Sequence, residues 1–327
     1  MAEESATTSS PVPLGLLWTL AGPEGGGPPW ADSDRWLDRM LAACSDVGIE
    51  GVHAGLDPAA PARSPRLMEA ISRAARPPKV VVLVVPPLVD RDPERGPVDL
   101  GPASQEARKD TPRERSGRLQ LLLEVRTGPS PGPEGIPESG AISAVVRQAS
   151  CDGWGFAFEG MPSLETLGRA LERRPGWIRF PVHLLSPTEA EAAIALPRTS
   201  GVPIVASDPF AGGLLDGSRL RGSPLETSGR PAPSDWAAVR RAWAPVLALG
   251  FLTEGHQRSL SQAALQYVLG TPGVAAVLVP AADPSELMEA AVSLQRPDLS
   301  AADRARVRRQ RAGATSFRGS AHSPEFK

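Results

Sequence analysis

Residues 201–225 read GVPIVASDPFAGGLLDGSRLRGSPL, and the fold prediction starts from this stretch. Residues 202–206 form a short apolar run, which is typical of a parallel strand buried on both faces. Ser207, Asp208 and Pro209 end the run, and a loop rich in glycine follows. Glycine lets the backbone approach a ligand closely or adopt a positive φ. The stretch therefore predicts a buried strand whose following loop lies beside a ligand site, as in α/β barrels.

Apolar runs and helical patterns alternate along the rest of the chain. Strands are expected at residues 13–22, 48–54, 79–85, 119–125, 153–158 and 177–185 before the quoted stretch, and at 272–280 after it. Helices are expected at 32–47, 64–75, 138–149, 164–173 and 187–196. The spacing of about 30 residues is that of a βαβ unit, and the strand count favours a closed (β/α)8 barrel over an open sheet. We expect one barrel domain at residues 12–311, a disordered segment at 1–11 and a flexible tail at 312–327.

The composition argues against several classes of function. The chain has 327 residues, of which 41% are hydrophobic, and its net charge of −2 predicts no general attraction to nucleic acid or to an anionic membrane. Residues 1–13 lack the basic and apolar parts of a signal peptide, and no run reaches the roughly 18 apolar residues of a membrane span. Cys44 and Cys151 are too few for a disulfide framework. We expect a cytoplasmic protein that binds neither nucleic acid nor membrane.

Two segments resemble aldo-keto reductases. The first is similar to the family's seventh strand and to the loop that folds over the cofactor pyrophosphate, through Ile204, Val205, Ala206, Pro209, Gly213, Leu215 and Gly217. In the second, residues 259–269 and 272–280 resemble the family's late helix and eighth strand, and residues 284–291 resemble its adenine-binding helix. The resemblance covers about residues 200–300 and implies an aldo-keto reductase-like (β/α)8 TIM barrel. It also implies hydride transfer from NADPH to a carbonyl, assisted by a tyrosine, a lysine, an aspartate and a histidine.

The four catalytic positions that the resemblance implies hold other residues. His53 stands at the place of the aspartate, and Pro58 stands at the place of the tyrosine. The one tyrosine of the chain, Tyr267, falls on the late helix, where we expect a core position away from the barrel mouth. The third strand ends without a lysine, and the fourth ends at residues 124–126 without a histidine. A phenol with a pKa of about 10 needs a cationic neighbour to release its proton readily. We therefore expect a barrel without the reductase machinery.

The cofactor positions implied by the resemblance are altered as well. Ala282 stands at the place of the basic residue that pairs with a 2′-phosphate, and Asp283 beside it has the opposite charge. Losing an arginine–phosphate contact is costly, although Arg219 and Arg221 can substitute for it in part. NADPH is therefore a cofactor implied by resemblance alone. The residues placed at a cofactor are Ser207, Asp208, Gly213, Leu215, Gly217, Arg219, Arg221 and Glu286.

Other acid–base groups fall near the expected barrel mouth. Strand ends place His53, Asp57 and Glu124 there, and a histidine beside carboxylates is a workable acid–base set. The alternative for each is a solvated loop residue, and for His53 also a hydrogen-bonded structural histidine. The sequence has no HxH, HExxH or Cys/His cluster for a metal, and no GxSxG or GxxxxGK[ST] motif.

Three hypotheses about function follow from these residues. The leading one is a non-catalytic or repurposed barrel that binds a small molecule or a partner protein. One alternative is a nicotinamide-dependent oxidoreductase of the aldo-keto reductase superfamily with a non-standard active site. The other alternative is a barrel enzyme that uses His53 and nearby carboxylates for acid–base chemistry.

Overall fold

The computed structural model describes residues 15–19, 34–49, 51–55, 69–71, 73–76, 78, 80–85, 120–126, 135–149, 153–217, 243–256, 258–281, 283–295 and 298–312. Residues 80–85 and 120–126 are described by their backbone alone. The segment expected to be disordered, 1–11, lies outside the described residues. So does the expected tail at 312–327, except that its first residue, Ala312, ends a helix.

Eight parallel strands form a closed barrel in which each strand pairs with the next along the chain and the last pairs with the first. This arrangement confirms the predicted (β/α)8 fold class. All carboxyl ends of the strands therefore lie at one end of the barrel, where this fold places its ligand sites. The strands are β1 (Gly15–Thr19), β2 (Gly51–Gly55), β3 (Val80–Val85), β4 (Gln120–Arg126), β5 (Gly153–Ala157), β6 (Ile178–Pro181), β7 (Ile204–Ser207) and β8 (Val274–Pro280).

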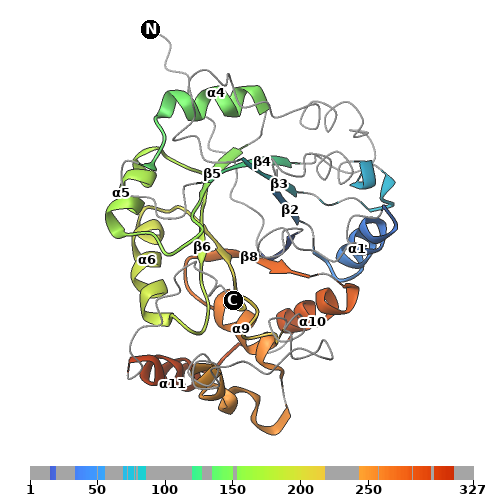
Figure 1. The fold of residues 1–327 in the computed structure, drawn as a ribbon, viewed down its shortest axis with the longest axis vertical. Helices are drawn as coiled ribbons and strands as arrows, with labels where there is room; N and C mark the ends of the chain where they lie inside the picture. Colours follow the sequence, from blue (N-terminus) through green and yellow to red (C-terminus); the bar gives the residue numbers. More distant parts are fainter. Residues whose placement is uncertain are drawn as a thin grey trace, which may run out of the picture.

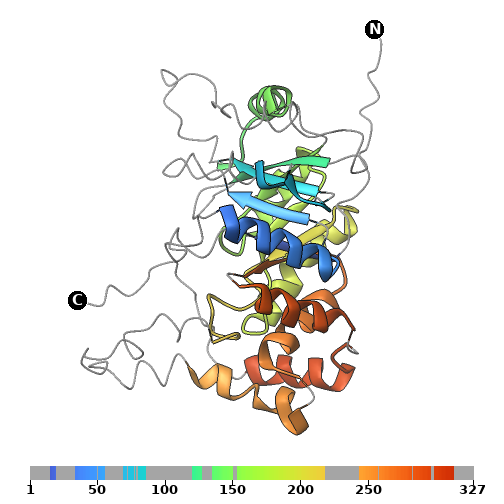
Figure 2. The ribbon, with the colours of Figure 1, turned by 90° about the vertical axis from the view of Figure 1, so that its right-hand side faces the viewer.

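Helices surround the strands, with α5 and α6 along one side of the barrel and α1 and α10 near another (Figure 1). Both views place the green α4 at one end of the molecule and the orange helices of residues 250–269 at the other (Figures 1 and 2). No helix among the described residues is both long enough and apolar enough to span a membrane. The helices are α1 (Asp34–Asp46), α4 (Ser139–Ala149), α5 (Leu164–Glu172), α6 (Pro187–Thr199), the 3₁₀ helix η5 (Gly250–His256), α9 (Leu260–Leu269), α10 (Pro284–Gln295) and α11 (Ala301–Ala312).

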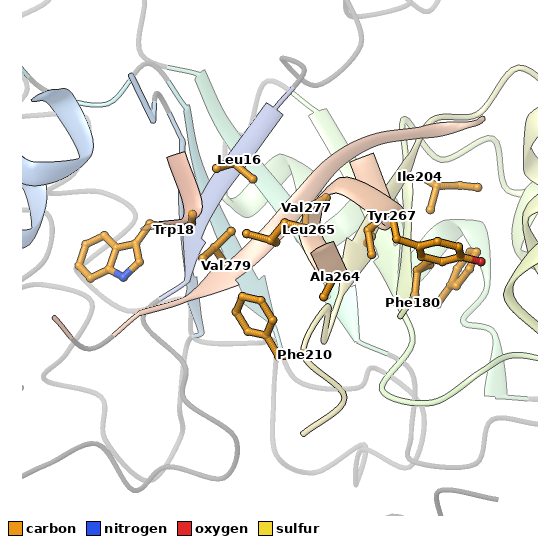
Figure 3. Close-up of a cluster of buried hydrophobic side chains, with 14 of the residues drawn as sticks. Leu16, Trp18, Phe180, Ile204, Phe210, Ala264, Leu265, Tyr267, Val277 and Val279 are labelled. Carbon is orange, nitrogen blue, oxygen red and sulfur yellow. The ribbon is translucent and has the colours of Figure 1, made fainter. Parts of the chain in front are cut away.

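The outer face of the strands packs against these helices. Trp18 of β1 is fully buried and meets Trp36 of α1 edge to face, with ring centroids 5.7 Å apart. The indole N–H of Trp18 donates a hydrogen bond to the carbonyl of Ala281, just after β8, at 3.0 Å. Figure 3 shows further members of this outer cluster on β6, β7, β8 and α9. A second cluster lies inside the barrel and contains Leu17, Trp177, Val205, Ala276 and Leu278.

Two predicted strand boundaries within the described residues were wrong by three residues or more. The second strand starts at Gly51 rather than at residue 48, because Gly48, with a φ of 78°, ends helix α1 and the N–H of Ile49 donates to the carbonyl of Cys44 at 2.8 Å. The sixth strand ends at Pro181 rather than at residue 185. His183 starts a turn instead, since its carbonyl accepts the N–H of Ser186 at 3.3 Å.

Candidate functional site

The inner wall of the barrel changes from apolar to polar toward the carboxyl ends of its strands. Side chains two positions apart on a strand point to the same face of the sheet. Each residue of the interior cluster is therefore followed, two positions later, by another residue that faces the barrel interior. On three strands that next position is polar. The pairs are Leu17 and Thr19 on β1, Trp177 and Arg179 at β6, and Val205 and Ser207 on β7. The barrel therefore has an apolar layer and, nearer the mouth, a polar layer.

A buried pair of side chains joins two strands of this polar layer. Thr19 and His53 are 8% and 5% exposed and lie opposite each other in the register of β1 and β2. A hydrogen bond of 3.1 Å joins the Thr19 hydroxyl to Nδ1 of the His53 ring. This contact orients the imidazole inside the barrel wall. The structure places His53 in the middle of β2, and its bond to Thr19 is what a structural histidine would make.

Arg179 is a residue of this layer that the sequence reasoning missed. Its neighbours Ile178 and Phe180 are fully buried in the outer cluster, so Arg179 faces the opposite way, into the barrel. It lies opposite Ala157 of β5 and Val205 of β7 in the strand register. Arg179 is half-buried. The signal was present in the sequence as an arginine between two large apolar residues of a short strand.

The loop after β7 is held by its own contacts. The Asp208 carboxylate accepts the N–H of Gly212 at 2.6 Å, and Asp208 itself has a φ of 48°. Gly213 and Gly217 adopt φ values of 82° and 73°, which explains the glycines in this loop. The side chain of Leu215 is packed in the core and is 2% exposed, so only the backbone of Leu215 can contact a ligand. The loop is thus a fixed rim beside the buried Ser207.

The remaining predicted site residues are only partly described. The register places Glu124 of β4 opposite Gly155 of β5, and Arg126 opposite Ala157. Asp57, Arg219 and Arg221 lie outside the described residues. No group of three side chains able to hold a metal ion occurs among the described residues.

Glu286 lies away from the barrel interior, at a small cavity between the β7 loop, α9 and α10. The cavity has a volume of about 50 Å³ and is lined in part by Asp216, Glu286 and Glu289. The hydroxyls of Ser259 and Ser261 both donate to one oxygen of Glu289 at 2.6 Å, which ties α9 to α10. Ser259 also caps α9 in a reciprocal pair with Gln262. Glu289 therefore has structural partners at the start of the neighbouring helix.

This cavity does not fit the adenosine 2′-phosphate end of NADPH. Ligand pockets usually enclose about 300–1,000 Å³, whereas this one encloses about 50 Å³. Its described lining includes three carboxylates, and none of these described residues is a basic side chain of the kind that pairs with a 2′-phosphate. Nearby, the hydroxyl and then the N–H of Ser285 donate to Asp283, which lowers the pKa of that carboxyl and keeps it charged. The negative charge of Asp283 is therefore opposite to the positive charge that a phosphate site needs.

Tyr267 occupies the outer layer of the protein, on α9. It is 2% exposed and belongs to the outer core cluster, where Figure 3 shows it with Phe180 and Ile204. The Arg304 guanidinium of α11 lies 5.2 Å from its ring centroid and donates to its backbone carbonyl at 3.0 Å. A short turn joins the end of α9 to the start of β8, so Tyr267 lies toward the amino ends of the strands, opposite the mouth. The prediction of a core position for this tyrosine is confirmed.

Burial makes the Tyr267 phenol a detectable source of alkaline instability. Burial and, to a lesser extent, the negative charge of Glu191 raise its pKa from 10.0 to about 12. Between these values the folded protein keeps a proton that the unfolded chain loses, so stability falls as pH rises from about 10 to about 12. The full loss is about 2–3 kcal/mol. Chemical unfolding of wild type and Tyr267→Phe at several alkaline pH values should show the smaller loss in the variant.

Buried Cys44, whose pKa burial also raises to about 12, is present in both proteins and cancels in this comparison. Equal alkaline losses in wild type and Tyr267→Phe would mean that the phenol is solvated rather than buried in the outer layer.

Comparisons with known proteins agree on one family. The sequence profile of the Aldo/keto reductase family matches residues 142–311. The solved aldo-keto reductase AKR11C1 from Bacillus halodurans, in its holo form, is similar with a TM-score of 0.56 and 17% identity, over 85% of this chain and 88% of that one. An aldo-keto reductase from Klebsiella pneumoniae in complex with NADP and acetate is similar with a TM-score of 0.58 and 17% identity, over 90% of each chain. The thermostable aldo-keto reductase Tm1743 is similar with a TM-score of 0.60 and 16% identity, over 89% of this chain and 93% of that one. No curated protein sequence matches.

Proposed function

The chain belongs to the Aldo/keto reductase family, and we propose that its barrel binds a small molecule at the carboxyl ends of the strands without reducing a carbonyl from NADPH. The observation that carries the proposal is the position of the one tyrosine of the chain. Tyr267 is buried between α9 and α11, with a pKa of about 12, and belongs to the outer core. A general acid must lie within hydrogen-bond reach of the group that it protonates. No other phenol is available to the mouth.

Two further observations support the loss of NADPH-dependent reduction. His53 stands where the resemblance places the family's aspartate, and its ring is hydrogen-bonded to Thr19. The cavity beside Glu286 is small and carries three carboxylates where a 2′-phosphate needs a basic group. The polar layer formed by Thr19, Arg179 and Ser207 supports a binding site at the mouth that does not depend on the cofactor positions.

Calorimetric titration of the full chain with NADPH, and separately with NADH, tests this proposal. We expect neither dinucleotide to bind more tightly than ~1 mM, because the adenosine end meets carboxylates in a cavity too small for it. The aldo-keto reductase from Klebsiella pneumoniae, solved with NADP, is the positive control for the titration. Micromolar binding of NADPH to this chain would contradict the proposal.

A second candidate function is acid–base catalysis by His53, which the buried position of this imidazole in the barrel wall favours. The two candidates differ in what His53→Ala changes. If His53 is structural, the variant loses about 1 kcal/mol of stability with the Thr19 hydrogen bond, and small-molecule binding changes little. Loss of turnover on an identified substrate at unchanged stability would support the enzyme instead.

A further inference from the structure

Helix α11 is attached to the rest of the protein mainly through polar contacts. Among residues 301–310, Val307 alone is buried. The helix lies on the outside of the molecule and contacts α6 (Figure 1). A helix of about 12 residues is only marginally stable in water by itself. The structure of α11 therefore depends on its contacts with the helices beneath it.

Arg304 attaches α11 to the end of α9. Its guanidinium donates to the carbonyls of Gln266 and Tyr267 at 3.1 and 3.0 Å and lies 5.2 Å from the centroid of the Tyr267 ring. The last turn of α9 has no basic residue of its own, so this guanidinium supplies the positive charge that the end of a helix favours. Gly270 leaves room for it, because a Cβ atom there would meet Nη2 of Arg304.

The end of α9 has hydrogen bonds that do not depend on Arg304. The N–H of Gly270 donates to the carbonyl of Gln266 at 3.0 Å, and the hydroxyl of Thr271 donates to the carbonyl of Tyr267 at 2.7 Å. A carbonyl oxygen can accept two hydrogen bonds, so departure of α11 would leave neither of these carbonyls without a donor. The end of α9 can therefore stay folded without α11.

Three further features of α11 indicate a weak attachment. Arg308 pairs with Glu191 of α6 at 3.0 Å, but the two side chains are 45% and 43% exposed, and exposed ion pairs contribute little. The guanidinium of Arg306, an exposed residue, lies 4.0 Å from the ring centroid of Phe251, and cation–π contacts at exposed sites are weak. The Oε1 atom of Gln310 is buried with no hydrogen-bond partner among the described residues, which opposes docking.

We infer that α11 is a detachable clamp, which leaves α6 and α9 as one unit while the barrel stays folded and thereby uncovers Tyr267. Segments with few buried apolar contacts open at a lower free energy than the core of a protein. Arg304 controls the docked fraction, because it makes the contacts with α9. The inference concerns the outer layer of the protein and is independent of the proposed function.

Hydrogen exchange of the full chain, followed by mass spectrometry, tests the inference. In the wild type we expect the amides of α11 to exchange faster than those of β1 and β8. Arg304→Gln should speed exchange in α11 about 10- to 100-fold, since hydrogen bonds from a charged group are lost, and should leave β1 and β8 unchanged. Arg304→Lys keeps the charge without the planar fork, so it should give a smaller increase.

Arg309→Gln is the matched control. It removes an exposed arginine from the same helix with the same change of net charge, and we expect it to leave exchange in α11 unchanged.

The one tyrosine of the chain is an optical probe of the same motion. With α11 docked, burial and then Glu191 raise the pKa of Tyr267 to about 12, although Arg304 and Arg308 lower it in part. If α11 stays docked in Arg304→Gln, loss of this positive charge raises the pKa further. If α11 detaches, the phenol becomes solvated and its pKa falls toward about 10. Titration of the phenolate absorbance, with Tyr267→Phe as the blank, distinguishes the two results.

Three outcomes would overturn the inference. In the wild type, exchange in α11 as slow as in β1 and β8 would mean that the helix leaves only when the barrel unfolds. In Arg304→Gln, an equal increase of exchange in α11, β1 and β8 would mean that the residue stabilises the whole fold. Unchanged exchange in α11, together with a raised pKa of Tyr267, would mean that the helix stays docked without Arg304.

Discussion

Trp18→Ala should lower the free energy of unfolding by about 3–5 kcal/mol, the usual cost of removing a fully buried aromatic side chain. Trp18 is 0% exposed, and its ring meets that of Trp36 at a centroid distance of 5.7 Å. The variant also leaves the carbonyl of Ala281 without its indole donor. The side chain thus joins β1, α1 and the end of β8 at the place where the barrel closes. Urea unfolding monitored by circular dichroism measures the loss.

Trp18→Phe is the matched variant for this prediction. It keeps an aromatic ring beside Trp36 but removes the indole N–H and part of the volume. We expect it to cost about 1–3 kcal/mol, the penalty for an unsatisfied buried acceptor with a small cavity. A loss below about 1 kcal/mol for Trp18→Ala would mean that this position is solvated and that β1 and β8 are not packed as described.

Gly155→Ala should destabilise the protein by about 3 kcal/mol, the upper end of the usual cost of overpacking. A Cβ atom at Gly155 would lie 2.4 Å from Cε2 of the Trp177 ring, closer than real side chains approach each other. Trp177 belongs to the interior cluster, so its ring has little room to move. Because Arg179 follows Trp177 by two residues on the same face, the change should also disturb the polar layer above it.

Gly168→Ala and a double variant are the controls for this second prediction. A Cβ atom at Gly168, on α5, would have no atom within 4 Å, and alanine favours a helix by about 0.5–1 kcal/mol over glycine. We therefore expect that variant to be at least as stable as wild type. In a Trp177→Leu background Gly155→Ala should cost less than it does in wild type, because the ring that the new methyl group meets is gone. Equal effects of Gly155→Ala and Gly168→Ala would contradict the interior packing.

The sequence predicted the barrel because its strands are apolar on both faces. The run VVVLVV of β3 and the run after Gly201 are typical of buried parallel strands. The errors occurred where a local backbone feature overrides hydrophobicity. Gly48 ends a helix with a positive φ, and the sixth strand ends where the carbonyl of His183 accepts the N–H of Ser186 and starts a turn.

The site was harder to predict than the fold. A family position led to His53 and the end of a predicted strand led to Ser207, and both residues are buried in the barrel wall. Arg179 was missed because no family position suggested it. That Arg179 faces the barrel interior follows only from knowing that Trp177, two residues before it, faces inward. The partner of His53 was also not predictable, since Thr19 lies 34 residues away and meets it only through the pairing of β1 and β2.

Steady-state consumption of NADPH with a panel of aldehydes, 4-nitrobenzaldehyde among them, tests the central claim most directly. General acid catalysis contributes about 10²–10⁴ in rate, and this chain has no phenol at the barrel mouth to supply it. We predict no consumption above the rate without protein, for wild type and for the variant His53→Ala with Arg179→Gln alike. Turnover by the wild type that this double variant abolishes would contradict the account.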